Sequence, residues 1–446
     1  MWVLLKNGRV IDPSQEMDLS ADLLIENGRI STIGQPDISG LDPADGTVYD
    51  CSGLVITPGL IDMHVHLREP GQEHKETIET GALAAAAGGF TTILGMPNTN
   101  PAIDNRAVVE YVINKGRYAA VNVLTTGAAT KGNDGHEMAE IGDMLDAGAV
   151  AISDDAFPIQ SADLMRRVLE YCRMFDVPFL AHCEDKTMTR DGVMNEGITC
   201  TILGLKPWPR QAEEIMIWRN IFLAELAKCK LHIQHVSTAG GVEAVRWAKS
   251  RGIQVTCETG PQYFSLTDQA LNSYDSNAKI NPPLRTEADI EAIKQGLADG
   301  TIDAIATDHA PHAQEEKEVE LQDAAFGMVG LETAISLVIT NLVKSGDLSI
   351  NSAIAKMTIE PARILGIDAG TLAKGAVADV TILDPEAKIV VKSAEFKSMG
   401  RNTPFEGFEL TGKAVATIVN GEIVYGADKR FASPSDSASS ASVRSK

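Results

Sequence analysis

Short apolar runs alternate with longer, helical-looking stretches through most of the chain. Between about residues 54 and 366 there are eight such runs, at 54–66, 91–96, 121–125, 149–154, 178–182, 231–235, 253–258 and 303–308. Eight strands that alternate with helices predict an α/β fold in which a parallel sheet closes into a (β/α)8 TIM barrel. The count alone leaves an open, doubly wound sheet as the alternative.

The two ends of the chain carry a different pattern, in which strand-like runs surround Asn-Gly dipeptides. The dipeptides are Asn7-Gly8, Asn27-Gly28 and Asn420-Gly421. Asn-Gly tolerates the positive φ angles of a tight type I′ turn, so each dipeptide predicts a β-hairpin. Further strand-like runs occur at 376–383 and 389–391. We expect both ends to form one small β-sandwich.

These patterns divide the chain into four segments. Residues 1–54 and 371–431 are the two parts of the predicted β-sandwich, and residues 55–370 are the predicted barrel. Residues 432–446 are rich in Ser, Ala and Pro, a composition typical of disordered segments. We therefore expect a large domain inserted into a small one, with a disordered tail.

Composition and charge narrow the possible partners. The net charge of -22 disfavours nucleic acid and anionic membranes, and an anionic substrate needs a local cationic pocket. No run approaches the ~20 apolar residues of a membrane span. The six cysteines are scattered without a CxxC pair, which indicates reduced thiols rather than disulfides or a thiolate metal site. We expect a cytoplasmic protein that binds a small molecule.

Most of the eight runs end in a residue that can bind metal or transfer protons. These residues are His64, His66, Asp154, Asp155, His182, His235 and Asp308. The carboxyl ends of the strands are where TIM barrels build their active sites. Because side chains alternate along a strand, His64 and His66 point to the same side. Imidazoles and carboxylates in this mixture predict a zinc site with one or two ions.

The other histidines are predicted to be outside this site. His232 lies three residues before His235, so alternation places it on the opposite side, as a packed or helix-facing histidine rather than a ligand. His309 directly follows Asp308, and alternation excludes it in the same way. His74 and His136 stand in segments with no strand end, where solvent exposure is expected.

The fourth run lacks the lysine that, once carboxylated, bridges two metals in many amidohydrolases. No lysine occurs between Lys131 and Lys186. Asp154 and Asp155 end this run, and either can supply a bridging carboxylate; the other is expected to be a helix cap or a turn residue.

Six motifs occur in an order that resembles the type I dihydroorotases, which are cyclic amidohydrolases. They are residues 62–71 (DMHVHLREPG), 95–99 (GMPNT), 181–184 (AHCE), 235–238 (HVST), 281–285 (NPPLR) and 308–312 (DHAPH). The motifs span essentially the whole predicted barrel. Six ordered motifs are far more specific than any one of them.

The resemblance implies roles for particular residues. It implies that His64, His66 and Asp308 hold one zinc, that His182 and His235 hold a second, that Asp155 replaces the carboxylated lysine, that Arg68 and Asn98 bind the substrate carboxylate, and that Asn281, His312, Phe326 and Gly327 make other substrate contacts. The chain departs from the family at Ala156, where glycine is usual, and at Ala325, where proline is usual.

The implied function is the reversible, zinc-dependent cyclisation of N-carbamoyl-L-aspartate to dihydroorotate in pyrimidine biosynthesis. In the hydrolytic direction Asp308 is expected to move a proton from the attacking water to the departing ring nitrogen. Two alternatives are a hydantoinase or allantoinase, for which Arg68 would have no partner, and an inactive scaffold for aspartate transcarbamoylase. A homodimer or an active complex with that transcarbamoylase also fits the resemblance.

The segment 312–327 carries a charged run, Glu315-Glu316-Lys317-Glu318, before Phe326 and Gly327. Such a polar segment at the carboxyl end of a barrel is typical of a mobile loop that closes over a site. A merely solvated loop is the alternative.

Overall fold

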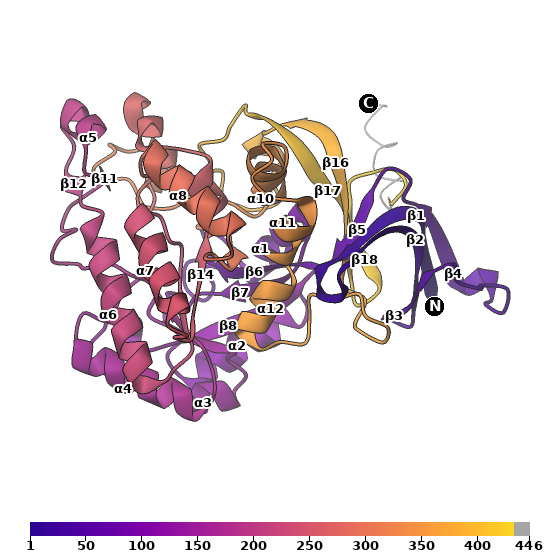
Figure 1. The fold of residues 1–446 in the computed structure, drawn as a ribbon, viewed down its shortest axis with the longest axis horizontal. Helices are drawn as coiled ribbons and strands as arrows, with labels where there is room; N and C mark the ends of the chain where they lie inside the picture. Colours follow the sequence, from indigo (N-terminus) through magenta and orange to yellow (C-terminus); the bar gives the residue numbers. More distant parts are fainter. Residues whose placement is uncertain (432–446) are drawn as a thin grey trace.

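The computed structural model of the chain describes residues 1–431 and contains two eight-stranded sheets (Figure 1). One sheet lies inside a ring of helices, and the other lies beside it and contains the first strand of the chain. The predicted disordered tail, residues 432–446, lies outside the described residues.

The first sheet is a parallel barrel. Its strands are β6 (Leu60–Val65), β7 (Phe90–Gly95), β8 (Asn122–Ala128), β9 (Ala151–Ser153), β10 (Phe179–Ala181), β13 (Leu231–Ile233), β14 (Val255–Thr259) and β15 (Ala304–Ile305), hydrogen-bonded in this order. A parallel bridge between Val65 and His309 brings the end of β6 to the segment after β15. Each of the eight predicted runs contributes one strand, so the predicted TIM barrel is confirmed.

Helices follow the strands and cover the barrel. They are α1 (Ile78–Gly88), α2 (Arg106–Gly116), α3 (Ile141–Asp146), α4 (Ala162–Met174), α5 (Ile198–Leu203), α6 (Gln211–Ala227), α7 (Ala239–Ser250), α8 (Glu287–Ala298), α9 (Gln314–Lys317), α10 (Ala334–Val338), α11 (Ile350–Ala355) and α12 (Ile359–Leu365). The main apolar core lies between strands and helices, and a smaller cluster that includes Met63, Leu94 and Leu180 fills the barrel interior. The strand ends above this cluster are left free for polar side chains.

The second sheet is built from both ends of the chain, as predicted. It contains β1 (Trp2–Asp12), β2 (Met17–Glu26), β3 (Arg29–Gly34), β4 (Gly46–Asp50), β5 (Val55–Pro58), β16 (Val380–Val390), β17 (Glu409–Val419) and β18 (Glu422–Gly426). The strand order is β18-β17-β16-β5-β1-β2-β3, and β4 also pairs with β1. A short third pair, β11 (Met194–Asn195) and β12 (Pro207–Trp208), lies near α5.

The first predicted run, 54–66, divides at Gly59 into strands of two different sheets. Its amino-terminal half is β5 of the second sheet, and its carboxyl-terminal half is β6 of the barrel. A Cβ atom at Gly59 would lie only 2.0 Å from Oγ1 of Thr91. The chain therefore passes from one sheet to the other through a point where only glycine fits.

Two of the three Asn-Gly hairpins are confirmed, and one is wrong. Asn27-Gly28 joins β2 to β3 and Asn420-Gly421 joins β17 to β18. Asn7-Gly8 instead lies inside the continuous strand β1, where Asn7 has φ 60° and the pairing with β2 shifts register. At this bulge β1 changes its partner on the other edge from β4 to β5, so the positive φ serves a change of neighbour rather than a turn.

Two predictions from composition can be compared with the structure. All six cysteines are buried and none forms a disulfide, as their scattered spacing predicts. Across residues 1–431 we find no helix with the length and apolar character needed to cross a membrane.

Candidate metal centre and substrate pocket

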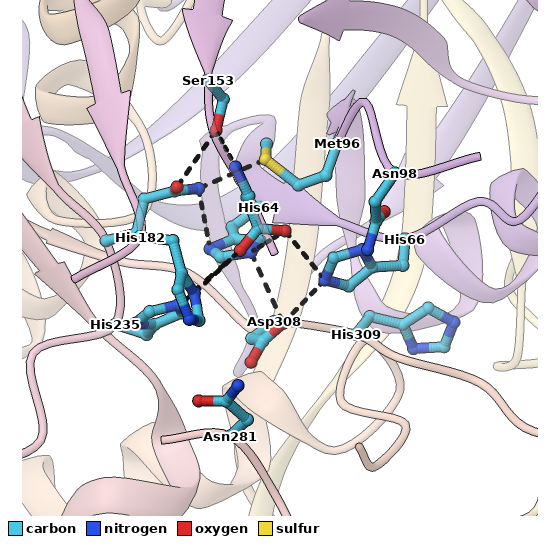
Figure 2. A network of polar contacts seen from close by, with 12 residues as sticks. His64, His66, Met96, Asn98, Ser153, His182, His235, Asn281, Asp308 and His309 are labelled. Atoms are coloured by element: carbon cyan, nitrogen blue, oxygen red, sulfur yellow. Dashed lines mark hydrogen bonds and ion pairs between the residues drawn. The ribbon is translucent and has the colours of Figure 1, made fainter. Parts of the chain in front are cut away.

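The strand-end side chains converge at the carboxyl end of the barrel (Figure 2). They come from β6 (His64) and from the residues just beyond β6 (His66), β9 (Asp155), β10 (His182), β13 (His235) and β15 (Asp308). The six residues come from the ends of five strands that are far apart in the sequence, and the parallel strands bring them together because every strand ends at the same rim.

Asp155 lies between two pairs of imidazoles. Its Oδ2 is 3.8 Å from Nε2 of His64 and 3.5 Å from Nε2 of His66. Its Oδ1 is 3.1 Å from Nδ1 of His182 and 3.8 Å from Nε2 of His235. The two groups that could hold a metal ion, His64-His66-Asp155 and Asp155-His182-His235, share this one carboxylate. We refer to His64, His66 and Asp308 as the first half-site and to His182 and His235 as the second.

Asp154 is turned away from both half-sites. Its Oδ1 accepts a hydrogen bond from the backbone N–H of His182 at 3.0 Å, and its Oδ2 accepts one from Ile159 at 2.9 Å. Burial raises the pKa of Asp154 to about 6, against these hydrogen bonds. Of the two aspartates left open by the sequence, Asp155 therefore faces the imidazoles, and Asp154 holds the backbone that carries one of them.

Asp308 completes the first half-site. Its Oδ1 lies 3.1 Å from Nε2 of His66 and 3.4 Å from Nε2 of His64. Asp308, His235 and Arg68 adopt left-handed backbone conformations, with φ of 53°, 36° and 62°. Such conformations cost about 1–3 kcal/mol each for residues other than glycine and concentrate at functional sites.

The cluster has the features of a divalent cation site. Two of its atoms, Nε2 of His64 and Oδ2 of Asp155, are buried and have no hydrogen-bond partner. Four buried or nearly buried carboxylates contact the four imidazoles, namely Asp155, Asp308, Glu184 and Glu258. A metal ion would bind the unpartnered atoms and offset the negative charge. The nitrogen and oxygen donors present therefore fit the metal that the sequence predicts.

Glu258 and Glu184 were missed as site residues. Glu258 contacts Nδ1 of His64 at 2.7 Å, and Glu184 contacts Nε2 of His182 at 3.1 Å. Burial opposes their ionisation, but the hydrogen bonds from histidines outweigh it and lower the pKa of each carboxyl to about 2. The signal was present in the sequence, because Glu258 ends the seventh apolar run and Glu184 stands two residues after His182.

A cavity of about 210 Å³ opens directly beside the cluster. Its walls are formed by His66, Arg68, Asn98, Asp155, Ala156, His182, Asn281, Asp308, Ala310, His312, Phe326 and Gly327. All six residues predicted to contact substrate are in this set. The structure thus brings the predicted metal ligands and the predicted substrate contacts to one cavity.

Arg68 supplies the cationic group in this wall. Its Nε donates to the backbone oxygen of Pro311 at 3.1 Å, and its Nη2 is 3.3 Å from Nε2 of His312. Burial lowers the pKa of Arg68 to about 10, which leaves it charged at neutral pH. The same burial, together with the charge of Arg68, holds the pKa of His312 below its usual value. The cavity therefore offers a fixed positive charge within an acidic protein.

Asn98 and Asn281 connect the cavity to the cluster. Oδ1 of Asn98 lies 2.8 Å from Nδ1 of His66 and accepts a hydrogen bond from it, so the amide nitrogen of Asn98 remains available to other partners. Nδ2 of Asn281 donates to Oε2 of Glu184 at 3.1 Å, and its buried Oδ1 has no partner. Asn98 therefore connects the cavity to the predicted ligand His66, and Asn281 connects it to Glu184, which contacts the predicted ligand His182.

Two buried lysines anchor the segment 312–327. Nζ of Lys317 donates to the backbone oxygens of Ala325 at 2.7 Å and Gly327 at 3.0 Å, and Nζ of Lys279 lies 4.3 Å from the ring centroid of Phe326. Lys317 is only 4% exposed, although it stands in a charged run that is typical of a solvated loop. Closure of this loop over a substrate stays a prediction.

The remaining histidines show where alternation works and where it fails. His74 and His136 are exposed, and His309 contacts Glu76 away from the cluster, as predicted. His232 is packed and lies outside both half-sites, as predicted, but the predicted side of the strand is wrong: it points into the barrel and contacts Glu258 at 3.2 Å. The regular strand β13 ends at Ile233, and the left-handed His235 breaks the alternation on which the prediction depended.

Comparisons with known proteins cover almost the whole chain. Residues 53–240 match a dihydro-orotase-like family model and residues 265–425 match an amidohydrolase family model. Proteins named dihydroorotase from Citrifermentans bemidjiense and Geotalea daltonii are each 52% identical to it, over 95% and 96% of this chain and 100% of each relative. The solved L-hydantoinase (dihydropyrimidinase) from Arthrobacter aurescens is 28% identical, with a TM-score of 0.85 over 96% of both chains.

Proposed function

This chain belongs to the dihydroorotase family of the amidohydrolases, and we propose that its barrel site binds zinc through the two half-sites described above. The chain is an enzyme that acts on a cyclic amide, interconverting dihydroorotate and N-carbamoyl-aspartate. The observation that carries the proposal is the position of Asp155 between two pairs of imidazoles, beside a cavity that contains Arg68.

In the proposal, His64, His66 and Asp308 would hold one zinc ion, His182 and His235 would hold a second, and Asp155 would serve as a ligand beside both half-sites. Bound zinc supplies Lewis acidity toward a carbonyl oxygen and lowers the pKa of water near it. The two unpartnered atoms, Nε2 of His64 and Oδ2 of Asp155, support this assignment because each otherwise loses its hydration without compensation.

Asp308 is the proposed proton carrier. During hydrolysis it takes a proton from the attacking water and delivers it to the ring nitrogen as the amide bond breaks; during ring closure it moves the proton the other way. Its Oδ1 lies 3.1 Å from Nε2 of His66. Asp308 also lines the cavity, so it stands between the metal cluster and the space for the substrate.

Arg68 is the proposed partner of the substrate carboxylate. A planar guanidinium offers paired donors that match a carboxylate, and its burial strengthens the interaction. Asn98 and Asn281 add amide groups, and His312, Phe326 and Gly327 line the same cavity. These residues orient the ring and exclude water from the reacting bond.

A hydantoinase-like activity is the second candidate, because a structurally similar solved protein is a hydantoinase. Hydantoins carry no carboxylate on the ring, so a buried Arg68 would remain uncompensated with such a substrate. The charged cavity therefore favours the carboxylated ring.

The assignment can be tested with protein purified without chelator. We expect bound zinc and hydrolysis of dihydroorotate, with little turnover of hydantoin or allantoin. If the protein binds zinc but hydrolyses only uncharged rings, its activity would be that of a hydantoinase. Protein without metal and without turnover would favour a scaffold role.

We also propose a cytoplasmic location, on the basis of the reduced, buried cysteines and the small-molecule substrate. A homodimer and a complex with aspartate transcarbamoylase stay predictions that size determination of the purified chain, alone and mixed with that partner, can check.

A further inference from the structure

We propose that Glu258 is a positioning residue that holds His64 with Nε2 facing the metal of the first half-site. The inference rests on the proposed zinc function and goes beyond it, because Glu258 itself is not a ligand there. Its side chain approaches the opposite nitrogen of the ring, Nδ1, at 2.7 Å. Both side chains are at most 1% exposed, so water does not compete for this contact.

Alternation along β14 places Glu258 inside the barrel. Val255 and Cys257 belong to the apolar core between strands and helices, so Thr256 and Glu258 point the other way. The carboxylate then lies beneath the metal cluster, on the side of His64 away from Asp155 and Asp308. From this position Glu258 can orient the imidazole without entering the ligand shell.

A chain of hydrogen bonds sets the tautomer of His64. Nδ1 of His232 is 2.9 Å from Oγ1 of Thr256, and Nε2 of His232 is 3.2 Å from Oε2 of Glu258. An ionised carboxylate only accepts hydrogen bonds, so both histidines must donate to Glu258. His64 therefore carries its proton on Nδ1, and the lone pair of Nε2 is free for the metal.

Among residues 1–431, Gln234 makes the competing contact at this nitrogen. Its Nε2 lies 3.2 Å from Nδ1 of His64, and an amide N–H there would require Nδ1 to accept. The contact to Glu258 is shorter by 0.5 Å (3.2 against 2.7 Å), and a charge-assisted hydrogen bond is roughly twice as strong as a neutral one. The carboxylate therefore decides the tautomer, and Gln234 keeps its other contacts, to Ser153 and Met96.

Glu184 provides a matched control on the second half-site. It contacts Nε2 of His182, the nitrogen that faces away from Asp155. Glu184 also contacts Lys186 at 2.6 Å and Asn281 at 3.1 Å. Each glutamate thus contacts the ring nitrogen of a histidine that faces away from Asp155, Glu258 in the first half-site and Glu184 in the second. Replacing each glutamate by glutamine in turn separates their effects on the two half-sites.

The test measures zinc affinity rather than turnover. Apo protein is titrated with zinc against a chromophoric chelator, and the binding phase of the first half-site is identified as the one that His66→Asn removes. We expect Glu258→Gln to weaken that phase by about 10–100-fold and to leave the other phase unchanged. Glu184→Gln is expected to weaken the other phase by a similar factor.

Several results would overturn the inference. Unchanged affinity of the first half-site in Glu258→Gln, or equal weakening of both phases, would show that Glu258 does not act through His64. Should Glu258→Gln fail to fold, His232→Gln tests the same chain of contacts, with a weakening of up to about tenfold expected at the first half-site alone. No zinc binding by the unaltered chain would refute the proposed zinc site itself, which is a different outcome.

Discussion

The floor of the active site and its wall are held in place in different ways. The floor consists of the metal-facing residues, which stand at the ends of parallel strands and are oriented by buried side chains such as Glu258 and Glu184. The wall consists of loop residues such as Phe326 and Gly327, which two lysines hold through backbone oxygens and an aromatic face. The floor depends on the regular barrel, whereas the wall depends on a few contacts between distant segments.

This difference separates two ways in which a substitution can act. A change in the floor removes a ligand or turns one away, and it alters the chemistry with little effect on the loop. A change in the wall alters how the substrate is held while the metal remains bound. The following experiments test that separation, from the largest expected effect to the smallest.

The largest effect is expected for Asp155→Asn, with Asp154→Asn as the matched control. Loss of the charged carboxylate between the imidazoles should lower kcat roughly 10³-fold and remove at least one zinc per chain, because several kcal/mol of transition-state stabilisation depend on the metals. Asp154→Asn should keep the metal content, since Asp154 bonds only to backbone N–H groups. Equal metal loss in both variants would contradict the assignment. Metal analysis and steady-state kinetics measure this.

Arg68→Ala is expected to lower kcat/KM for dihydroorotate on the order of 10²-fold, with zinc content unchanged. Removing one partner of a buried charged hydrogen bond costs about 1.5–3 kcal/mol, which corresponds to this factor. Arg68→Lys keeps the charge but loses the planar pair of donors, and it should recover only part of the activity. A loss of zinc in Arg68→Ala would show that floor and wall are not separate.

Removal of zinc by a chelator is expected to destabilise the floor more than the wall. A ligand present at a hundredfold excess over its Kd stabilises the native state by about 2.7 kcal/mol, and this contribution disappears with the metal. We expect a lower Tm and faster hydrogen exchange at the ends of β6 and β10, reversed by added zinc. Exchange that increases first in residues 312–327 would contradict the comparison.

The smallest effect is expected for Lys317→Met, which acts on the wall alone. The ammonium donates to the backbone oxygens of Ala325 and Gly327, and burial lowers its pKa to about 7, so part of the lost bonding is offset by relief of desolvation. We expect a net loss of about 1 kcal/mol, a KM raised about fivefold and an unchanged zinc content. Limited proteolysis of residues 312–327 measures how firmly the loop is held, steady-state kinetics measures KM, and metal analysis measures the zinc content.

The sequence predicted the barrel and the floor because both depend on local patterns. Each apolar run contributed one strand to the barrel, and the polar residues at the ends of the runs arrived at the same rim. The side of the strand predicted for His232 was wrong, because the left-handed residue His235 ended the alternation. The prediction also failed for Asn7-Gly8, where the same preference for positive φ produced a bulge instead of a turn.

The sequence by itself determined which residues are available for chemistry and, through the period of the strands, which of them share one end of the barrel. Only the tertiary structure decided that Asp155 rather than Asp154 faces the imidazoles, that Glu258 orients His64, and that Lys317 is buried. The physical reason is that strand periodicity is a local property of the backbone. Orientation of an individual carboxylate or ammonium group depends on the hydrogen-bond partners and the burial that distant segments provide.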